Sequence, residues 1–157
     1  MEAVAAEAGV GKGTVFRRFG DRASLARAII SQHETGLQEG MIRGPAPLGP
    51  GAPPRERLAA FGAAYLAFLD RHVDLLLAAE GTAVNWLASG VYAMYRTHLS
   101  LLLREGGCGD SADYLSDVLM APLAAPVFKY HRQVRGLELA ELVQEYEGLV
   151  ARVLGSR

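Results

Sequence analysis

The chain has 157 residues, half of them hydrophobic, and its 16 basic and 17 acidic side chains give a formal net charge of −1. This composition supports a folded core and argues against disorder outside short linkers, and it gives no global basic field for nucleic acid. The single cysteine, Cys108, excludes an internal disulfide, and with no membrane-length apolar run or signal-peptide pattern in the sequence we expect a cytoplasmic protein.

Residues 4–19 predict two short helices joined by a tight turn. Val4, Ala5 and Ala8 share one face of the first helix. Gly9 can take the positive φ that ends a helix, and Val10 is expected to fill the corner. The second helix should turn Val15, Phe16 and Phe19 inward and Lys12, Thr14, Arg17 and Arg18 outward. A helix-turn-helix with a basic second helix is the arrangement that places side chains in the major groove of DNA.

The charge around this motif is local. Between Lys12 and Arg27 there are five cations and one anion, Asp21. The motif itself runs without interruption as Val4-Ala5-Ala6-Glu7-Ala8-Gly9-Val10-Gly11-Lys12-Gly13-Thr14-Val15-Phe16-Arg17-Arg18-Phe19. It resembles the signature of the tetracycline-repressor (TetR) family over about residues 4–30. The resemblance implies a transcriptional regulator, a repressor that a small-molecule effector releases from its double-stranded DNA operator.

The resemblance also implies which residues contact bases or phosphates. These are Lys12, Gly13, Thr14, Phe16, Arg17, Arg18 and Arg22. Gly13 would let the backbone approach the DNA closely. Phe16 stands where the family has a tyrosine whose hydroxyl meets a phosphate, so we expect Phe16 to act in packing. Arg18 and Arg22 replace a histidine and a lysine and keep a donor for phosphate.

A helix-turn-helix needs a further helix over its apolar face, and the resembled family has one before the motif. Three explanations are open: a start codon assigned too late, a trimmed chain, or a truncated protein with its first helix missing. We favour the first. The third gives the alternative function, a ligand-binding and dimerisation module that has lost DNA binding through truncation.

The next residues predict a connecting helix and a linker. Asp21 can cap a helix that continues to about residue 42. Residues 44–54 contain five prolines and three glycines, which predicts a surface linker. We therefore divide the chain into a DNA-binding part with its connecting helix (1–43), the linker (44–54) and a helical ligand-binding and dimerisation domain (55–157).

The apolar spacing after the linker is helical throughout, which predicts an all-α fold. One helix should run from Arg55 to His72 and extend as a shorter apolar helix over 75–79 that ends at Gly81. Further helices are expected over 91–105, 114–135 and 139–154. Pro122 and Pro126 lie inside the 114–135 helix and should bend it.

Aromatic residues with polar tips suggest a ligand pocket in this domain, since such side chains suit a pocket between helices. The expected ligand contacts are Tyr65, Phe68, Trp86, Tyr95 and His98. The alternative for each of these side chains is a place in the helical core. No residue here is carried over from the resembled family, because its ligand sites are too variable.

The helices over 114–135 and 139–154 keep apolar faces after covering one side of a small domain, so we expect a homodimer in which they form a four-helix bundle with a second copy. Packing within the chain alone is the alternative. His33, His72, His98 and His131 lie apart, with no metal-ligand spacing. The sequence also has no nucleotide-binding or hydrolase motif. We therefore expect no metal, no cofactor and no enzyme activity.

Overall fold

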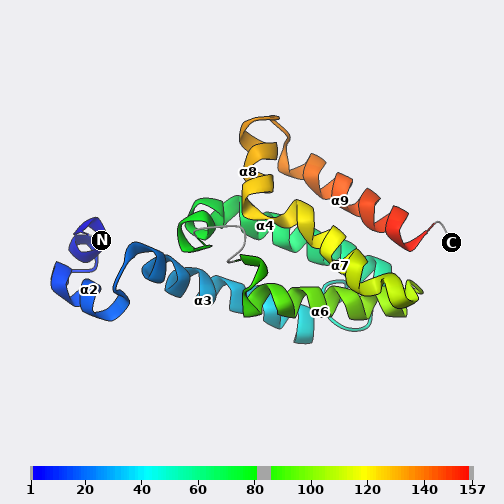
Figure 1. The fold of residues 1–157 in the computed structure, drawn as a ribbon, viewed down its shortest axis with the longest axis horizontal. Helices are drawn as coiled ribbons and strands as arrows, with labels where there is room; N and C mark the ends of the chain where they lie inside the picture. The colour runs from blue at the N-terminus through cyan, green and yellow to red at the C-terminus, as the bar shows by residue number, and fades with distance from the viewer. Residues whose placement is uncertain (1, 81–85, 156–157) are drawn as a thin grey trace.

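A computed structural model describes residues 2–80 and 86–155, and within those ranges the chain is helical with no strand, so the all-α prediction is confirmed. Two short helices, α1 (Glu2–Glu7) and α2 (Lys12–Phe19), lie at one end, and α3 (Arg22–Arg43) leads from them into a bundle (Figure 1). The bundle contains α4 (Pro54–Glu80), α6 (Gly90–Glu105), α7 (Ala112–Met120), α8 (Ala125–Gln133) and α9 (Leu139–Leu154). None of the described helices is long and apolar enough to span a membrane.

The first two helices form the expected helix-turn-helix. Gly9 (φ +64°) lies in the turn after α1 and Gly20 (φ +74°) separates α2 from α3, both in the left-handed region that favours glycine. A small cluster of buried side chains holds α1, α2 and the start of α3 together; its members are Ala5, Val15 and Leu25, with Phe19 packed against them. We call this the N-terminal cluster.

Two apolar side chains of this unit face outward, contrary to the prediction. Phe16 is 53% exposed and Val10 is 43% exposed. Phe16 follows the buried Val15 by one position, which is a rotation of about 100° around the helix. Because α2 packs mainly on α1 and α3 in the described chain, its buried face is narrow. The expected packing role of Phe16 is therefore wrong.

α3 begins as the sequence predicts. The Asp21 carboxylate accepts a hydrogen bond from the Ser24 backbone N–H at 2.7 Å, which caps the helix and lowers the pKa of Asp21. α3 then contributes to two hydrophobic clusters. Leu25 belongs to the N-terminal cluster, whereas Ala26 and Ile30 belong to the main core of the bundle. One continuous helix thus joins the helix-turn-helix to the bundle.

Residues 45–52 form turns between α3 and α4, and Leu48 packs against the main core. α4 then runs without a break from Pro54 to Glu80, where the sequence predicts a shorter second helix over 75–79. Neither Val73 nor Asp74 interrupts it. α4 is apolar on several sides because α3, α6, α8 and α9 all pack around it. The predicted end at Gly81 lies outside the described residues.

The predicted helix over 114–135 is in fact two helices. α7 ends at Met120, a 3-10 turn covers Ala121–Leu123, and α8 starts at Ala125. Pro122 and Pro126 each lie in the first turn of a new element. Proline is tolerated there because the first N–H groups of a helix have no intrahelical partner. These prolines therefore start elements instead of bending one. The predictions for α6 and α9 are confirmed within one residue.

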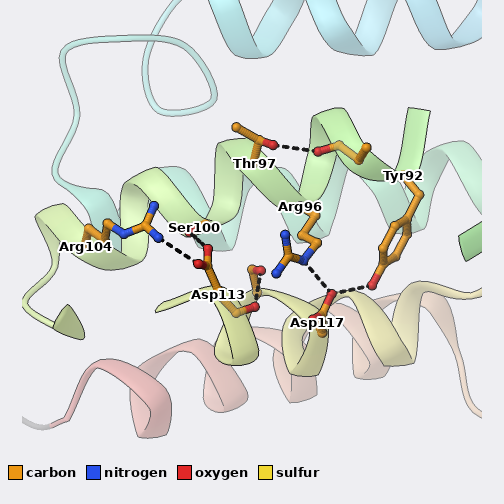
Figure 2. A network of polar contacts seen from close by, with 9 residues as sticks. Tyr92, Arg96, Thr97, Ser100, Arg104, Asp113 and Asp117 are labelled. Carbon is orange, nitrogen blue, oxygen red and sulfur yellow. Dashed lines mark hydrogen bonds and ion pairs between the residues drawn. The ribbon is translucent and has the colours of Figure 1, made fainter. Parts of the chain in front are cut away.

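A row of hydrogen bonds and ion pairs connects α6 to α7 (Figure 2). The α6 side chains, four residues apart, are Tyr92, Arg96, Ser100 and Arg104. Tyr92 Oη donates a hydrogen bond to Asp117 at 2.6 Å, and Ser100 Oγ donates one to Asp113 at 2.6 Å. Burial, with the Asp117 contact, raises the pKa of Tyr92 to about 12. The four-residue spacing on both helices sets their register in the bundle.

Candidate nucleic-acid interface

The outer face of α2 carries exposed polar and basic side chains at the end of the molecule away from the bundle (Figure 1). These are Lys12, Thr14, Arg17 and Arg18, with the exposed Phe16 beside them. Gly11 occupies the N-cap position of α2, and it has no side chain that could accept hydrogen bonds from the first N–H groups of the helix. No acidic residue lies in the first turn of α2. The N-terminal N–H groups of α2 therefore keep their partial positive charge, which favours an anion such as a phosphate.

Arg17 and Arg18 have no ion-pair partner among the described residues. The Arg18 guanidinium lies 5.6 Å from the centre of the Phe19 ring, a cation–π contact that leaves its N–H donors available. Unpaired guanidinium groups on an exposed helix are ready to bind phosphates or base edges.

Lys12 forms an ion pair with Glu2 of α1. This contact is not predictable from the sequence, because the two residues are ten positions apart and no periodic pattern links them. Both side chains are mostly exposed, and an exposed ion pair contributes only about 0–1 kcal/mol. Lys12 can therefore exchange Glu2 for a phosphate at little cost.

Arg22 lies across the turn from α2, in the first turn of α3. It borders a hollow of about 350 Å³ between α1, α3 and α4, together with Val4 and Ile29. The structure thus gathers the predicted α2 residues on one short helix and places Arg22 beside them on the next.

Gly13 lies within α2, and no atom lies within 4 Å of the place where a Cβ would stand. The fold therefore does not require glycine at this position. A requirement for Gly13 would have to come from outside the chain, from close approach of a partner to the backbone.

We expect Gly13→Ala to stabilise the protein and to weaken its binding to DNA. Alanine is favoured over glycine by roughly 0.5–1 kcal/mol in a helix interior and by less in the first turn, where Gly13 lies, so the melting temperature should rise slightly. Gly36→Ala is the matched control, since Gly36 also lies in a helix with open space around it. Gly36→Ala should stabilise the protein without changing DNA affinity. Equal DNA affinity for the native protein and Gly13→Ala would show that the backbone of α2 does not approach DNA closely.

The predicted ligand contacts do not form one group. Tyr65, Tyr95 and His98 pack around the ring of Phe61, and Phe68 packs on Tyr65. Trp86 lies apart from them, edge-on against Tyr92 with ring centres 4.7 Å apart. Tyr65 and Tyr95 are 1% and 0% exposed, and their rings meet edge to face at 5.3 Å. Burial, with the charge of Arg57, lowers the pKa of His98 to about 4, so His98 is neutral at pH 7. Tyr65, Phe68 and Tyr95 belong to the main core of the bundle, and the half-buried His98 lies beside them.

Trp86 lines a pocket of about 360 Å³ where α3, the end of α4 and the start of α6 meet. Glu34, Leu76 and Val91 also line it. Glu34 is only 8% exposed and is not among the predicted ligand contacts. The signal was present, because Glu34 continues the four-residue spacing of Ala26 and Ile30 on the buried side of α3.

A family model described as "Bacterial regulatory proteins, tetR family" matches residues 1–29. The match covers α1, α2 and the first turns of α3, the same residues that form the N-terminal cluster and the exposed basic face. No curated protein and no solved structure matches the chain.

Proposed function

We propose that this chain, which belongs to the tetR family of bacterial regulatory proteins, is a repressor that binds its operator as a homodimer and leaves it when a small molecule binds. As a member of that family it is a DNA-binding transcriptional regulator. The observation that supports the proposal most strongly is the pair of exposed, unpaired arginines, Arg17 and Arg18, on the second helix of the helix-turn-helix.

In the proposed complex α2 enters the major groove. Arg17 and Arg18 take guanine edges or phosphates, since the fork of a guanidinium fits both. Lys12, Thr14 and the N-terminal N–H groups of α2 bind the phosphate backbone and set the position of the helix on the duplex. Arg22 adds a backbone contact from the start of α3. Phe16 has no polar atom, so it supplies apolar contact surface beside them.

A single α2 reads only one half-site, and two-fold symmetry would match a palindromic operator. The apolar stripe of α9 is already packed within the chain, because Leu142, Tyr146 and Val150 are buried in the main core. The proposed contact with a second copy therefore uses the outer side of α8 and α9. Tyr130 and Val134 are 52% and 72% exposed there, close in sequence to the α8–α9 turn.

Release follows from the position of α3 between the helix-turn-helix (within residues 1–43) and the proposed sensing domain (55–157). A ligand that moves the bundle end of α3 also moves α2, because Leu25 of α3 packs in the N-terminal cluster. The half-sites of an operator are one helical turn apart, about 34 Å, or a multiple of that. A shift of a few ångströms between the two copies of α2 would therefore lose one half-site.

Binding to the promoter DNA of the protein's own gene tests the proposal. We expect a salt-dependent complex, a two-part footprint and a particle mass of twice 16.8 kDa in light scattering. Val134→Asp should give monomers and a one-sided or lost footprint, whereas Leu101→Asp, which changes a 53% exposed side chain on α6, should leave the dimer intact. Binding without sequence preference, or tight binding by a monomer, would contradict the proposed repressor.

A further inference from the structure

Glu34 is a buried carboxylate with no hydrogen bond or ion pair to another residue in the described ranges. Three polar or charged residues are buried in the described part of the chain, and two of them, Ser100 and Ser116, donate hydrogen bonds of 2.6 Å. The third is Glu34, which makes no hydrogen bond or ion pair with any described residue, and burial raises its pKa. An unpaired buried charge is costly, and an apolar residue would serve the core better. This arrangement indicates a role in binding.

The carboxylate of Glu34 lies on the wall of the 360 Å³ pocket. The apolar walls are Ile30 of α3, Leu76 and Ala79 of α4, Val91 of α6 and the indole of Trp86, and Ser31 and Ser89 also line the pocket. Pockets of a few hundred Å³ with largely apolar walls and a few placed polar groups are typical small-molecule sites.

Arg27 also borders the pocket but does not neutralise Glu34. Its Nη1 donates a hydrogen bond to the Ala79 carbonyl at 2.9 Å, and its Nη2 donates one to Ser24 Oγ at 2.9 Å. Arg27 is therefore held toward the end of α4, and the negative charge of Glu34 is left for a ligand.

We propose that this pocket is the effector site and that it takes an apolar molecule carrying a protonated amine, with the ammonium group on Glu34 and the apolar body against Trp86 and Leu76. This proposal rests on the proposed ligand-released repressor. An ammonium ion satisfies the unpaired carboxylate through a charge-assisted hydrogen bond and is attracted by the face of an indole.

The same pocket explains how the ligand reaches the DNA-binding surface. Glu34, Ile30 and Arg27 all belong to α3, and Arg27 ties this helix to the last turn of α4 through the Ala79 carbonyl. A ligand that enters between α3 and α4 weakens this hydrogen bond and tilts α3. Leu25, two residues before Arg27, carries the movement to the N-terminal cluster and α2.

Trp86 is the only tryptophan of the chain, so its fluorescence reports binding at this pocket without any DNA. The probes are phenethylamine, the neutral phenethyl alcohol and the anionic 3-phenylpropanoate, titrated to millimolar concentrations. We expect the amine to change the Trp86 emission and the other two to have little effect. Glu34→Gln should weaken amine binding about tenfold or more, which is the effect of losing a hydrogen bond to a charged group. Glu39→Gln, on the exposed side of α3, should bind like the native protein.

Thermal unfolding tests whether Glu34→Gln is folded, and we expect this variant to melt above the native protein because a buried carboxylate is removed. Equal binding of amine and alcohol, stronger binding of the carboxylate, native amine affinity in Glu34→Gln, or no emission change with the amine would each overturn the proposed site.

A separate titration of the operator complex tests the repressor itself. If the amine binds at Trp86 and the operator complex persists, the pocket assignment stands and the release mechanism fails. If another compound releases the operator without affecting Trp86, the repressor stands and the pocket assignment fails.

Discussion

Replacing Arg17 and Arg18 together by alanine is expected to abolish specific binding to the operator and to leave the fold intact. Both side chains are exposed and have no ion-pair partner in the described chain, so their loss removes little from the folded state. Surface substitutions of this kind change the free energy of unfolding by no more than about 0.5 kcal/mol. Loss of an arginine that reads a base costs about 1–3 kcal/mol of binding free energy.

The single variants separate the two possible roles of each arginine. An arginine that reads a base relaxes the sequence preference when it is removed. An arginine that binds a phosphate weakens binding to all sequences alike and lowers the slope of log K against log salt by about 1. Fluorescence anisotropy with labelled operator and with scrambled DNA, over a series of salt concentrations, measures both quantities.

The matched control is the double variant Arg55→Ala/Arg71→Ala. It makes the same change in net charge at two exposed positions away from α2. This control should keep the affinity and sequence preference of the native protein. If the Arg17→Ala/Arg18→Ala protein binds operator as tightly as the control does, the outer face of α2 is not the DNA-binding surface.

The parts of the fold that the sequence predicts correctly depend on local signals. Gly9 and Gly20 mark the ends of α1 and α2 by their positive φ, and Asp21 caps α3 through a backbone three residues away. The regular stripe of α9, from Leu139 to Val153, is packed along the core as its spacing indicates. Signals of this kind act within one turn of a helix, so no knowledge of the partner helices is needed to interpret them.

The parts that the sequence does not predict depend on which helix packs where. Phe16 has an apolar side chain in a plausible inward position, yet in the described chain no helix covers that side of α2. From the sequence alone, Pro122 is equally consistent with a bend in one helix and with the start of a new element. Glu34 stands in an apolar stripe, but only the tertiary structure shows that a pocket lies in front of it. Of the predicted ligand contacts, Trp86 lies apart from the other four, which pack together at the core, since ring-rich segments suit a core as well as a pocket.

Gly62→Ala is expected to destabilise the protein strongly, although alanine is the better helix former. Gly62 lies in α4, and a Cβ at this position would stand 2.0 Å from both Cδ1 and Cε1 of Tyr146 on α9. Tyr146 is 3% exposed and packed in the main core, so its ring cannot swing into solvent. α9 must therefore move away from α4. Overpacking a core costs about 1–3 kcal/mol or more, which exceeds the gain of about 1 kcal/mol in helix propensity.

A double-mutant cycle shows whether the ring of Tyr146 causes the loss. In a Tyr146→Leu background the clash is removed, so Gly62→Ala should lower the free energy of unfolding only slightly or even raise it by stabilising α4. Chemical denaturation of the four proteins gives the coupling free energy, which should be large because the two positions are in direct contact. Gly36→Ala gives the change in the free energy of unfolding for a helical glycine with open space around it. If Gly62→Ala is as stabilising as Gly36→Ala, α9 does not cross α4 at this glycine.

Because the proposed dimer uses the outer side of α8 and α9, a displacement of α9 in Gly62→Ala should also weaken dimerisation and operator binding. The Tyr146→Leu background should restore both along with stability.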